Sequence, residues 1–249
     1  MRLVIEPAAS PSVFSAKWQG SLDEEYPSAD GTMSLRLQKD SEIRFGPAYY
    51  SAAVYGSDGK CLFNFGDRRF FSCSGYGQDS SKTTGPWSPT SNLLVLPELL
   101  SKHPGPGVKI ARITFFDASR QAQVAAWDFE SLVTPKMWSL DGQFYLFRDV
   151  FGVFVFSIDE RKLFSISESK SQHCFFLDRS VCVIEKTGKV SILDASGSLL
   201  LAGHIPDDRG TVRRAMFDEK HNSVWVLTKL AEEFDAAESC YRIRLLLAD

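Results

Sequence analysis

One short motif, made of an aromatic residue, a polar turn and an apolar run, recurs along this chain. It occurs as Trp87-Ser-Pro-Thr-Ser-Asn-Leu-Leu-Val-Leu, Trp138-Ser-Leu-Asp-Gly-Gln-Phe-Tyr-Leu-Phe and Phe217-Asp-Glu-Lys-His-Asn-Ser-Val-Trp-Val. The first two copies are 51 residues apart, and the third begins 79 residues after the second. A fourth copy, Phe175-Phe-Leu-Asp-Arg-Ser-Val-Cys-Val-Ile, lies near the middle of that longer interval. The longer interval is thereby divided into two of about 40 residues, and a period of this size predicts one supersecondary unit that is used several times.

The apolar runs of the repeat are typical of strands joined by short hairpins. Turns rich in Gly and Asp separate them at Asp58-Gly59, Arg148 to Gly152 and Glu185 to Lys189. Many runs are continuously apolar, which indicates strands covered on both faces. Helical patterns are restricted to Pro97–His103, Asp128–Val133 and Ala231–Glu238. The fold class predicted from these patterns is all-β.

Trp87-Ser-Pro-Thr-Ser and Trp138-Ser-Leu-Asp-Gly resemble the W-S-P-D-G blade element of TolB-like and related WD-type β-propellers. The resemblance implies a β-propeller, and it covers about two thirds of the chain. The Trp-Asp dipeptide of WD repeats is missing from the matching positions, because Trp127-Asp128 lies outside the repeat phase. A two-sheet sandwich is the other all-β architecture with many short strands, but it gives no reason for the repeat.

The repeat predicts a single propeller domain over residues 1–249. Five blades are expected, centred near Val54, Val95, Leu146, Val183 and Val226. Six blades are the alternative. In that arrangement Met33 to Phe45 supplies part of another blade, or pairs with the C-terminal strand Tyr241 to Leu247 to close the ring.

Charge and composition narrow the classes of partner. The formal net charge is −3 and the estimated pI about 5.9, so neither nucleic acid nor an anionic membrane is an expected partner.

The apolar run after Met1 is too short for a signal peptide, and no later run is long enough for a membrane span. The five cysteines are an odd number in a large chain, which favours reduced core thiols. These observations predict a cytoplasmic protein.

Residue patterns that would carry catalysis or hold a cofactor are weak. Thr187-Gly-Lys lacks the rest of a phosphate-binding loop, and Ser72 to Gly77 contains no nucleophile elbow. A metal site at His173, Cys174 and Cys182 competes with the simpler interpretation that these are strand residues. Carboxylates near strand ends could serve a funnel-type hydrolase, although turn and capping roles are favoured for them; they are Asp149, Asp178 and Asp218. We therefore expect no cofactor, no metal and no enzymatic activity.

Two acidic segments, each containing an aromatic residue, are the candidate partner-binding sites. They are Asp23–Asp30 and Glu232–Glu238. Carboxylates steer a basic protein surface toward them, and a nearby aromatic side chain supplies an anchor, although solvated loops would look the same. The candidate residues are Asp23, Glu24, Glu25, Tyr26, Asp30, Glu232, Glu233, Phe234 and Asp235.

The function predicted from the sequence is therefore non-catalytic protein binding. In size, acidity and lack of catalytic motifs, the chain is similar to the cytosolic immunity proteins that bacteria pair with antibacterial toxins. The concrete form of this hypothesis is an immunity protein that neutralises a toxin with a basic domain, such as a type VI secreted nuclease. The alternatives are a propeller scaffold subunit of a larger assembly and a funnel-type hydrolase.

Overall fold

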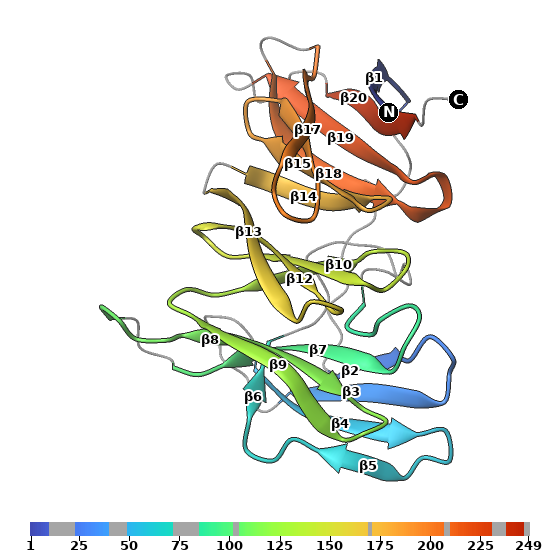
Figure 1. Ribbon diagram of the computed structural model, residues 1–249, viewed down its shortest axis with the longest axis vertical. Coiled ribbons are helices and arrows are strands. Elements are labelled where there is room, and N and C mark those ends of the chain that lie inside the picture. The colour runs from blue at the N-terminus through green and yellow to red at the C-terminus, as the bar shows by residue number, and fades with distance from the viewer. Residues whose placement is uncertain are drawn as a thin grey trace. The chain divides into compact units, whose positions relative to one another are not determined.

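The computed structural model describes residues 1–9, 23–39, 49–71, 85–101, 105–168, 171–206, 210–230 and 238–246. Figure 1 shows these residues as successive antiparallel sheets. They contain no α-helix, and one 3₁₀ turn occupies Glu219–His221. The prediction of an all-β fold is confirmed.

The strands form three four-stranded sheets and one eight-stranded sheet within the described ranges. The eight-stranded sheet contains β2 (Asp23–Pro27), β3 (Met33–Lys39), β4 (Tyr50–Gly56), β5 (Cys61–Asn64), β6 (Arg69–Phe70), β7 (Leu93–Leu99), β8 (Ala111–Asp117) and β9 (Ala122–Phe129). The second sheet contains β10 (Thr134–Trp138), β11 (Phe144–Arg148), β12 (Gly152–Ser157) and β13 (Lys162–Glu168). The third contains β14 (Ser171–Leu177), β15 (Ser180–Glu185), β16 (Lys189–Leu193) and β17 (Leu199–His204). The fourth contains β18 (Gly210–Asp218), β19 (Ser223–Leu230), β20 (Ser239–Leu246) and β1 (Arg2–Pro7).

The chain forms two compact units. One comprises Met1–Lys17, Phe144–Leu146 and Phe151–Asp249, and the other comprises Trp18–Gln143 and Phe147–Val150. A single domain over residues 1–249 stays a prediction, and so does the number of blades.

In three of its four copies, the repeated motif spans a hairpin between two neighbouring strands of a sheet. Trp138 is the last residue of β10, and its apolar run is β11. Phe175 and Phe217 occupy β14 and β18, and their apolar runs form β15 and β19. Trp87 forms an isolated bridge to Leu94 at the start of β7. The motif therefore marks strand–turn–strand units, as the sequence predicts.

The N-terminal strand completes the last sheet. β1 pairs antiparallel with β20 from Arg2 opposite Leu246 to Pro7 opposite Tyr241. The alternative in which Met33 to Phe45 pairs with Tyr241 to Leu247 is wrong, because Met33–Lys39 pairs with β2 and β4 instead. A strand can join a sheet through its backbone although its apolar run is only three residues long.

Two of the predicted helices are wrong where the structure describes them, because each begins with the end of a strand. Pro97 and Leu99 belong to β7, and Asp128 and Phe129 end β9. Pro97 is tolerated because β6 ends at Phe70. Just beyond it, the Phe71 N–H donates to the Pro97 carbonyl oxygen over 2.8 Å, and the ladder stops at the missing N–H of Pro97. The third predicted helix, Ala231–Glu238, falls almost entirely outside the described residues.

A hydrophobic core covers the inner face of the eight-stranded sheet. Leu35, Leu37 and Val54 are buried on this face, while Arg36 between the two leucines is exposed. This alternation follows from the period of two along a strand. Trp87 packs in the same core, and Tyr26 packs against it from β2. One face of β2 to β5 therefore packs in the core, and the opposite face carries polar side chains.

Candidate functional site

The opposite face of β2, β3, β4 and β5 carries a pocket of about 450 Å³. We call it the outer-face pocket. The side chains of Glu25, Arg36 and Ala53 share one cross-strand row, which continues to Asn64 on β5. The pocket is lined by Glu24, Glu25, Arg36, Leu37, Gln38, Ser51, Ala52, Ala53, Tyr55 and Asn64. Its polar side chains are the Glu25 carboxylate, one guanidinium, amides and hydroxyls, which suit the recognition of polar protein groups. Glu24 borders the pocket, but its side chain lies with Tyr26 on the other face of β2.

A charged and aromatic triad organises the pocket. The Nε–H of Arg36 donates a hydrogen bond to Oε1 of Glu25 over 3.0 Å, and the Arg36 guanidinium lies 4.4 Å from the centre of the Tyr55 ring. Hydrogen bonds from Arg36 and from the Ser34 hydroxyl lower the pKa of Glu25. Both partners of the ion pair keep about half of their side-chain surface exposed, 47% for Arg36 and 54% for Glu25. The pair is therefore accessible to a partner, and by itself it stabilises the fold little.

Glu24 lies on β2 beside an aromatic anchor. The Tyr26 hydroxyl donates a hydrogen bond to Oε2 of Glu24 over 2.6 Å. The Trp87 indole Nε1–H in turn donates to the backbone carbonyl oxygen of Tyr26 over 2.8 Å. The aromatic motif therefore holds the acidic strand in place.

Asp30, another candidate binding residue, holds a turn. Its Oδ1 accepts hydrogen bonds from the Thr32 backbone N–H over 3.0 Å and from the hydroxyls of Ser28 and Thr32. These bonds, led by the Thr32 backbone N–H, lower the pKa of Asp30. Asp30 stabilises the β2–β3 turn and is not part of the pocket lining. That it also contacts a partner stays a prediction.

The remaining candidates divide into two groups. Asp23 begins β2, and only its backbone is described. Glu232, Glu233, Phe234 and Asp235 lie outside the described residues. Of the nine candidates, the pocket brings together Glu24 and Glu25, and partner binding by any of the nine stays a prediction. The alternating polar side chains of Ser34, Arg36 and Gln38 are the sequence signal that could have located the pocket.

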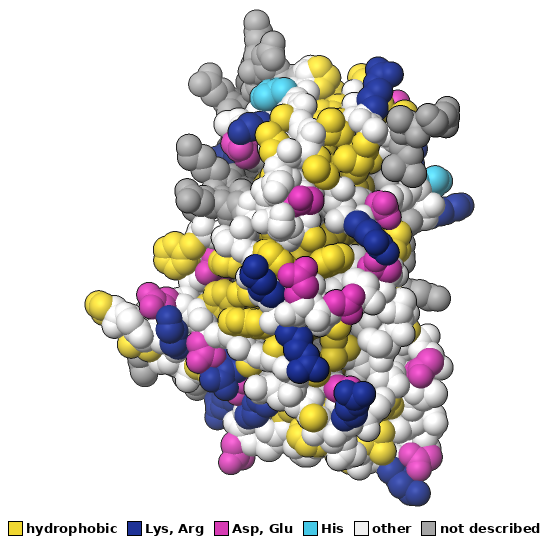
Figure 2. Space-filling model, in the orientation of Figure 1, with side chains coloured by type: hydrophobic (Ala, Val, Ile, Leu, Met, Phe, Trp, Pro, Cys, Tyr) yellow, Lys and Arg dark blue, Asp and Glu magenta, His cyan; other side chains and the backbone are white. Residues whose placement is uncertain are grey.

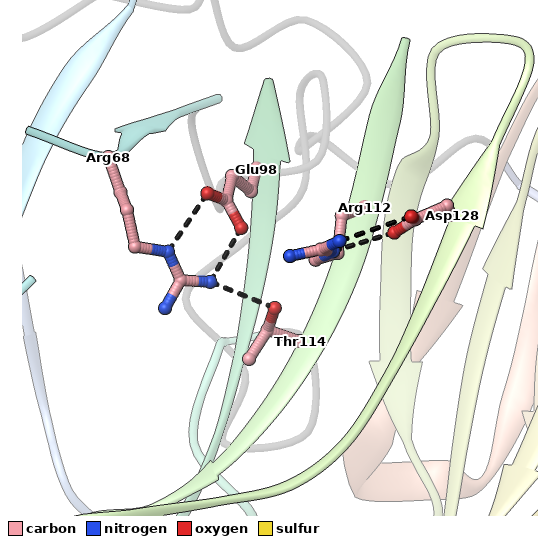
Figure 3. A network of polar contacts seen from close by, with 5 residues as sticks. All are labelled: Arg68, Glu98, Arg112, Thr114 and Asp128. Atoms are coloured by element: carbon pink, nitrogen blue, oxygen red, sulfur yellow. Dashed lines mark hydrogen bonds and ion pairs between the residues drawn. The ribbon is translucent and has the colours of Figure 1, made fainter. Parts of the chain in front are cut away.

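A partly buried ion pair lies in the same sheet and was not predicted. The Arg68 guanidinium donates to both carboxylate oxygens of Glu98, over 2.9 Å and 2.5 Å, and to the Thr114 hydroxyl over 3.1 Å (Figure 3). Arg112 makes a second two-pronged pair with Asp128 over 2.6 Å and 3.1 Å. Glu98, Arg112 and Asp128 are cross-strand neighbours in β7, β8 and β9. These charges alternate in sign, which supports a structural role in fixing the strands.

The carboxylates considered for hydrolysis have local partners or lie in a turn. Asp149 accepts a hydrogen bond from the Ser131 hydroxyl over 2.9 Å. Oδ2 of Asp218 lies 2.7 Å from Nδ1 of His221 and accepts from the Trp225 indole over 3.2 Å. Asp178 is exposed in the β14–β15 turn with a φ of 57°. These contacts do not test whether the chain is an enzyme.

The cysteines of the third sheet are core residues. Cys174 and Cys182 are buried on the paired strands β14 and β15, and burial raises the pKa of the Cys182 thiol. Cys240 is also buried, whereas Cys61 is exposed. In the described part of the chain, no group of three or more His, Cys, Asp or Glu side chains could hold a metal ion.

Positive and negative side chains are mixed on the face that Figure 2 shows, without one broad basic area. Within the described ranges, no helix is long and apolar enough to cross a bilayer. The cytoplasmic location stays a prediction.

Comparison with solved structures identifies the fold. Over 90% of this chain, the structure is similar to the Dos1 propeller, with a TM-score of 0.53 and 9% sequence identity. The chain has a β-propeller fold. Raptor of Chaetomium thermophilum is also similar, with a TM-score of 0.50 and 11% identity over 91% of this chain. This chain spans 54% of the Dos1 chain and 19% of the Raptor chain.

Comparison of the sequence with known families and curated proteins finds no relative of this propeller. No family model matches the chain, and no curated protein matches it. Membership of the TolB-like or WD-type families therefore stays a prediction. Since a propeller hosts many unrelated activities, the function has to be argued from its site.

Proposed function

We propose that this propeller is a non-catalytic protein-binding module and that the outer-face pocket is part of its binding surface. The observation that carries the proposal is the position of the Glu25 side chain in a pocket of about 450 Å³ that also holds Arg36 and Tyr55. Carboxylates, Arg and an aromatic ring are the groups that give charge complementarity and anchoring at protein interfaces. Half-exposed charges of this kind contribute more to the recognition of a partner than to stability.

Site-directed crosslinking tests the proposal. A photo-crosslinking residue at Gln38 places the reactive group in the pocket, and one at Lys60 places it on the exposed β4–β5 turn outside the pocket lining. In the organism that encodes the chain, the Gln38 position should crosslink to one defined protein, and the Lys60 position should not. Equal crosslinking at both positions, or none at Gln38, would contradict the proposed site.

A more specific form of the proposal is an immunity protein that neutralises a bacterial toxin, for example a type VI secreted nuclease. Its support is the acidic charge of Glu24 and Glu25, because a basic nuclease surface would be drawn to it. The test is protection: if a toxin gene adjoins the gene for this chain, cells that express that toxin should survive when the chain is co-expressed. Death of the co-expressing cells would exclude this form and leave the general proposal standing.

A further inference from the structure

The outer-face pocket lies over a small residue. In one cross-strand row, Ala53 of β4 stands between Arg36 of β3 and Asn64 of β5. Its neighbours on the same face of β4 are Ser51 and Tyr55, because side chains two positions apart share a face of a strand. The Ala53 methyl group is thus surrounded by four larger side chains, and this difference in size produces the hollow of about 450 Å³. A hollow of this volume is in the range of small-molecule pockets.

The charges of the pocket cancel. Hydrogen bonds from Arg36 and from the Ser34 hydroxyl lower the pKa of Glu25, so Glu25 is ionised at neutral pH. Its carboxylate is paired with the Arg36 guanidinium over 3.0 Å. Among the described lining residues, no other side chain on this face carries a charge, since Glu24 lies on the opposite face. A charged ligand would meet an attractive and a repulsive group side by side, so the pocket favours a neutral one.

Several polar groups of the lining have hydrogen-bonding capacity to spare. Arg36 uses its Nε–H for Glu25, and neither of its Nη atoms has a hydrogen-bond partner in the described part of the chain. Within the same residues, the Gln38 side-chain amide has none either. Oδ1 of Asn64 accepts from the Gly66 N–H over 2.8 Å, which leaves the Nδ2 group of Asn64 as a donor. The pocket therefore offers donors at Arg36 and Asn64, and both a donor and an acceptor at Gln38.

Arg36 is held in place from two sides. Its Nε–H bonds Glu25, and its guanidinium lies 4.4 Å from the centre of the Tyr55 ring. The edge that carries the two Nη groups remains for a ligand, and such a planar edge matches two neighbouring oxygen atoms. The floor is the Ala53 methyl group, and polar groups surround it. This arrangement fits a sugar ring, which has C–H groups on its face and hydroxyls that both donate and accept around its edge.

We infer that the outer-face pocket binds a neutral sugar unit, whose hydroxyls bond the side chains of Arg36, Gln38 and Asn64. The inference goes beyond the proposed function, because the sugar is either a free molecule or part of a glycan on the partner protein. Hydroxyls can take the place of water on these exposed groups without loss of hydrogen bonds.

A panel of sugars tests the inference on the full-length chain. The probes are the methyl glycosides of glucose, galactose, mannose and N-acetylglucosamine, and the measurement is the NMR signals of the Gln38 and Asn64 side-chain amides. At least one glycoside should shift both signals, with a Kd of about 1 mM, as expected for a few hydrogen bonds in an open site. The amide of Asn92, which bonds Ser119 outside the pocket lining, should not shift. If no glycoside shifts the Gln38 and Asn64 signals, the inference is wrong.

Charged analogues test the neutrality of the pocket. The probes are the amino sugar and the uronic acid with the same ring stereochemistry as the glycoside that binds best. Both should bind more weakly than the neutral glycoside, whose binding should change little with salt. Tighter binding of either charged analogue, lost at high salt, would make the pocket a cation or an anion site and would overturn the inference.

A matched pair of variants tests the floor of the pocket. Ala53→Leu fills the hollow, and Ala202→Leu makes the same change at an exposed position of β17 outside the pocket lining. Ala53→Leu should weaken the best glycoside by about tenfold or more, because the leucine side chain clashes with the sugar face, whereas Ala202→Leu should leave its binding unchanged. If Ala53→Leu unfolds, Gln38→Ala tests the rim, with an expected loss of about fivefold for one net hydrogen bond. A folded Ala53→Leu variant or a Gln38→Ala variant that binds the glycoside like the unaltered chain would overturn the site.

Crosslinking with the photo-reactive residue at Gln38 distinguishes the two sources of the sugar. If the best glycoside abolishes the crosslink, the sugar belongs to a glycan on the crosslinked protein. If the crosslink persists while the glycoside binds, the sugar is a free ligand.

The two proposals fail separately. If Gln38 crosslinks to a protein and no glycoside binds, protein binding stands and the sugar site is wrong. If a glycoside binds as expected and no protein crosslinks at Gln38, the sugar site stands and the proposed function is wrong.

Discussion

The indole Nε1–H of Trp87 donates to the backbone carbonyl oxygen of Tyr26 over 2.8 Å. Trp138, the same residue of the next motif copy, donates to the carbonyl oxygen of Pro86 over 3.4 Å. Each motif tryptophan therefore bonds a backbone carbonyl from an earlier part of the chain. Through Trp87 this bond connects the repeat that defines the fold with the strand that carries the candidate site.

Trp87→Phe should destabilise the protein by about 1 to 2 kcal/mol, because it keeps most of the aromatic volume in the core but removes the hydrogen bond to Tyr26. Trp87→Ala should cost about 3 to 5 kcal/mol, since it also creates a cavity. Urea unfolding followed by circular dichroism measures both values. If Trp87→Phe is as stable as the unaltered chain while Trp87→Ala is not, the indole acts only by packing and the role of the hydrogen bond is contradicted.

Gly142→Ala should destabilise more than Gly31→Ala. Both glycines have a φ of 69°, so the backbone cost of a side chain, about 1 kcal/mol, is common to both. A Cβ at Gly142 would lie 2.7 Å from the Ser88 hydroxyl oxygen, whereas one at Gly31 meets nothing within 4 Å. The difference in unfolding free energy measures the close contact of the two tryptophan motifs. Identical losses would contradict that contact.

Glu98→Gln should destabilise by about 2 to 3 kcal/mol, because it weakens the partner of a partly buried guanidinium. Glu98 keeps 8% of its side-chain surface exposed and Arg68 keeps 32%, so the loss should stay below that of a fully buried pair. Asp58→Asn, which removes an exposed pair with Lys60, should cost no more than about 0.5 kcal/mol. Chemical denaturation of both variants provides the measurement, and equal costs would contradict a structural role for Arg68.

Stability should fall with acid in a way that depends on Asp128. Hydrogen bonds from Arg112 lower the pKa of Asp128 from its usual value of 3.8. A depressed folded-state pKa contributes stability above the unfolded value and loses it as the pH falls through the folded value. The difference in unfolding free energy between the unaltered chain and Asp128→Asn should therefore be present at neutral pH and should narrow below about pH 4. Urea titrations at several pH values measure this difference in unfolding free energy. A difference that stays constant down to pH 2.5 would contradict a stabilising role for the ionised Asp128.

Local sequence determined the class of fold. Period-two alternation in Met33–Lys39, Gly turns such as Gly188, and the tryptophan motifs all act within a few residues, so they could be read without the structure. The same local reasoning misassigned Pro97–His103 as a helix, because partner strands, not the segment itself, decide that Pro97–Leu99 pairs with β8.

Only the tertiary structure decided which distant segments meet. The Arg244 guanidinium donates a hydrogen bond to Oε1 of Glu6 over 2.7 Å, although the two residues are 238 positions apart in the sequence. They meet where β1 pairs with β20. The pocket likewise depends on four strands aligning Glu25, Arg36, Ala53 and Asn64 in one row. The acidic sequence Asp23-Glu-Glu indicated a binding segment, but it could not show that one carboxylate bonds Tyr26 and the next bonds Arg36. Strand register sets these pairings, and register depends on contacts between residues that are far apart in the chain.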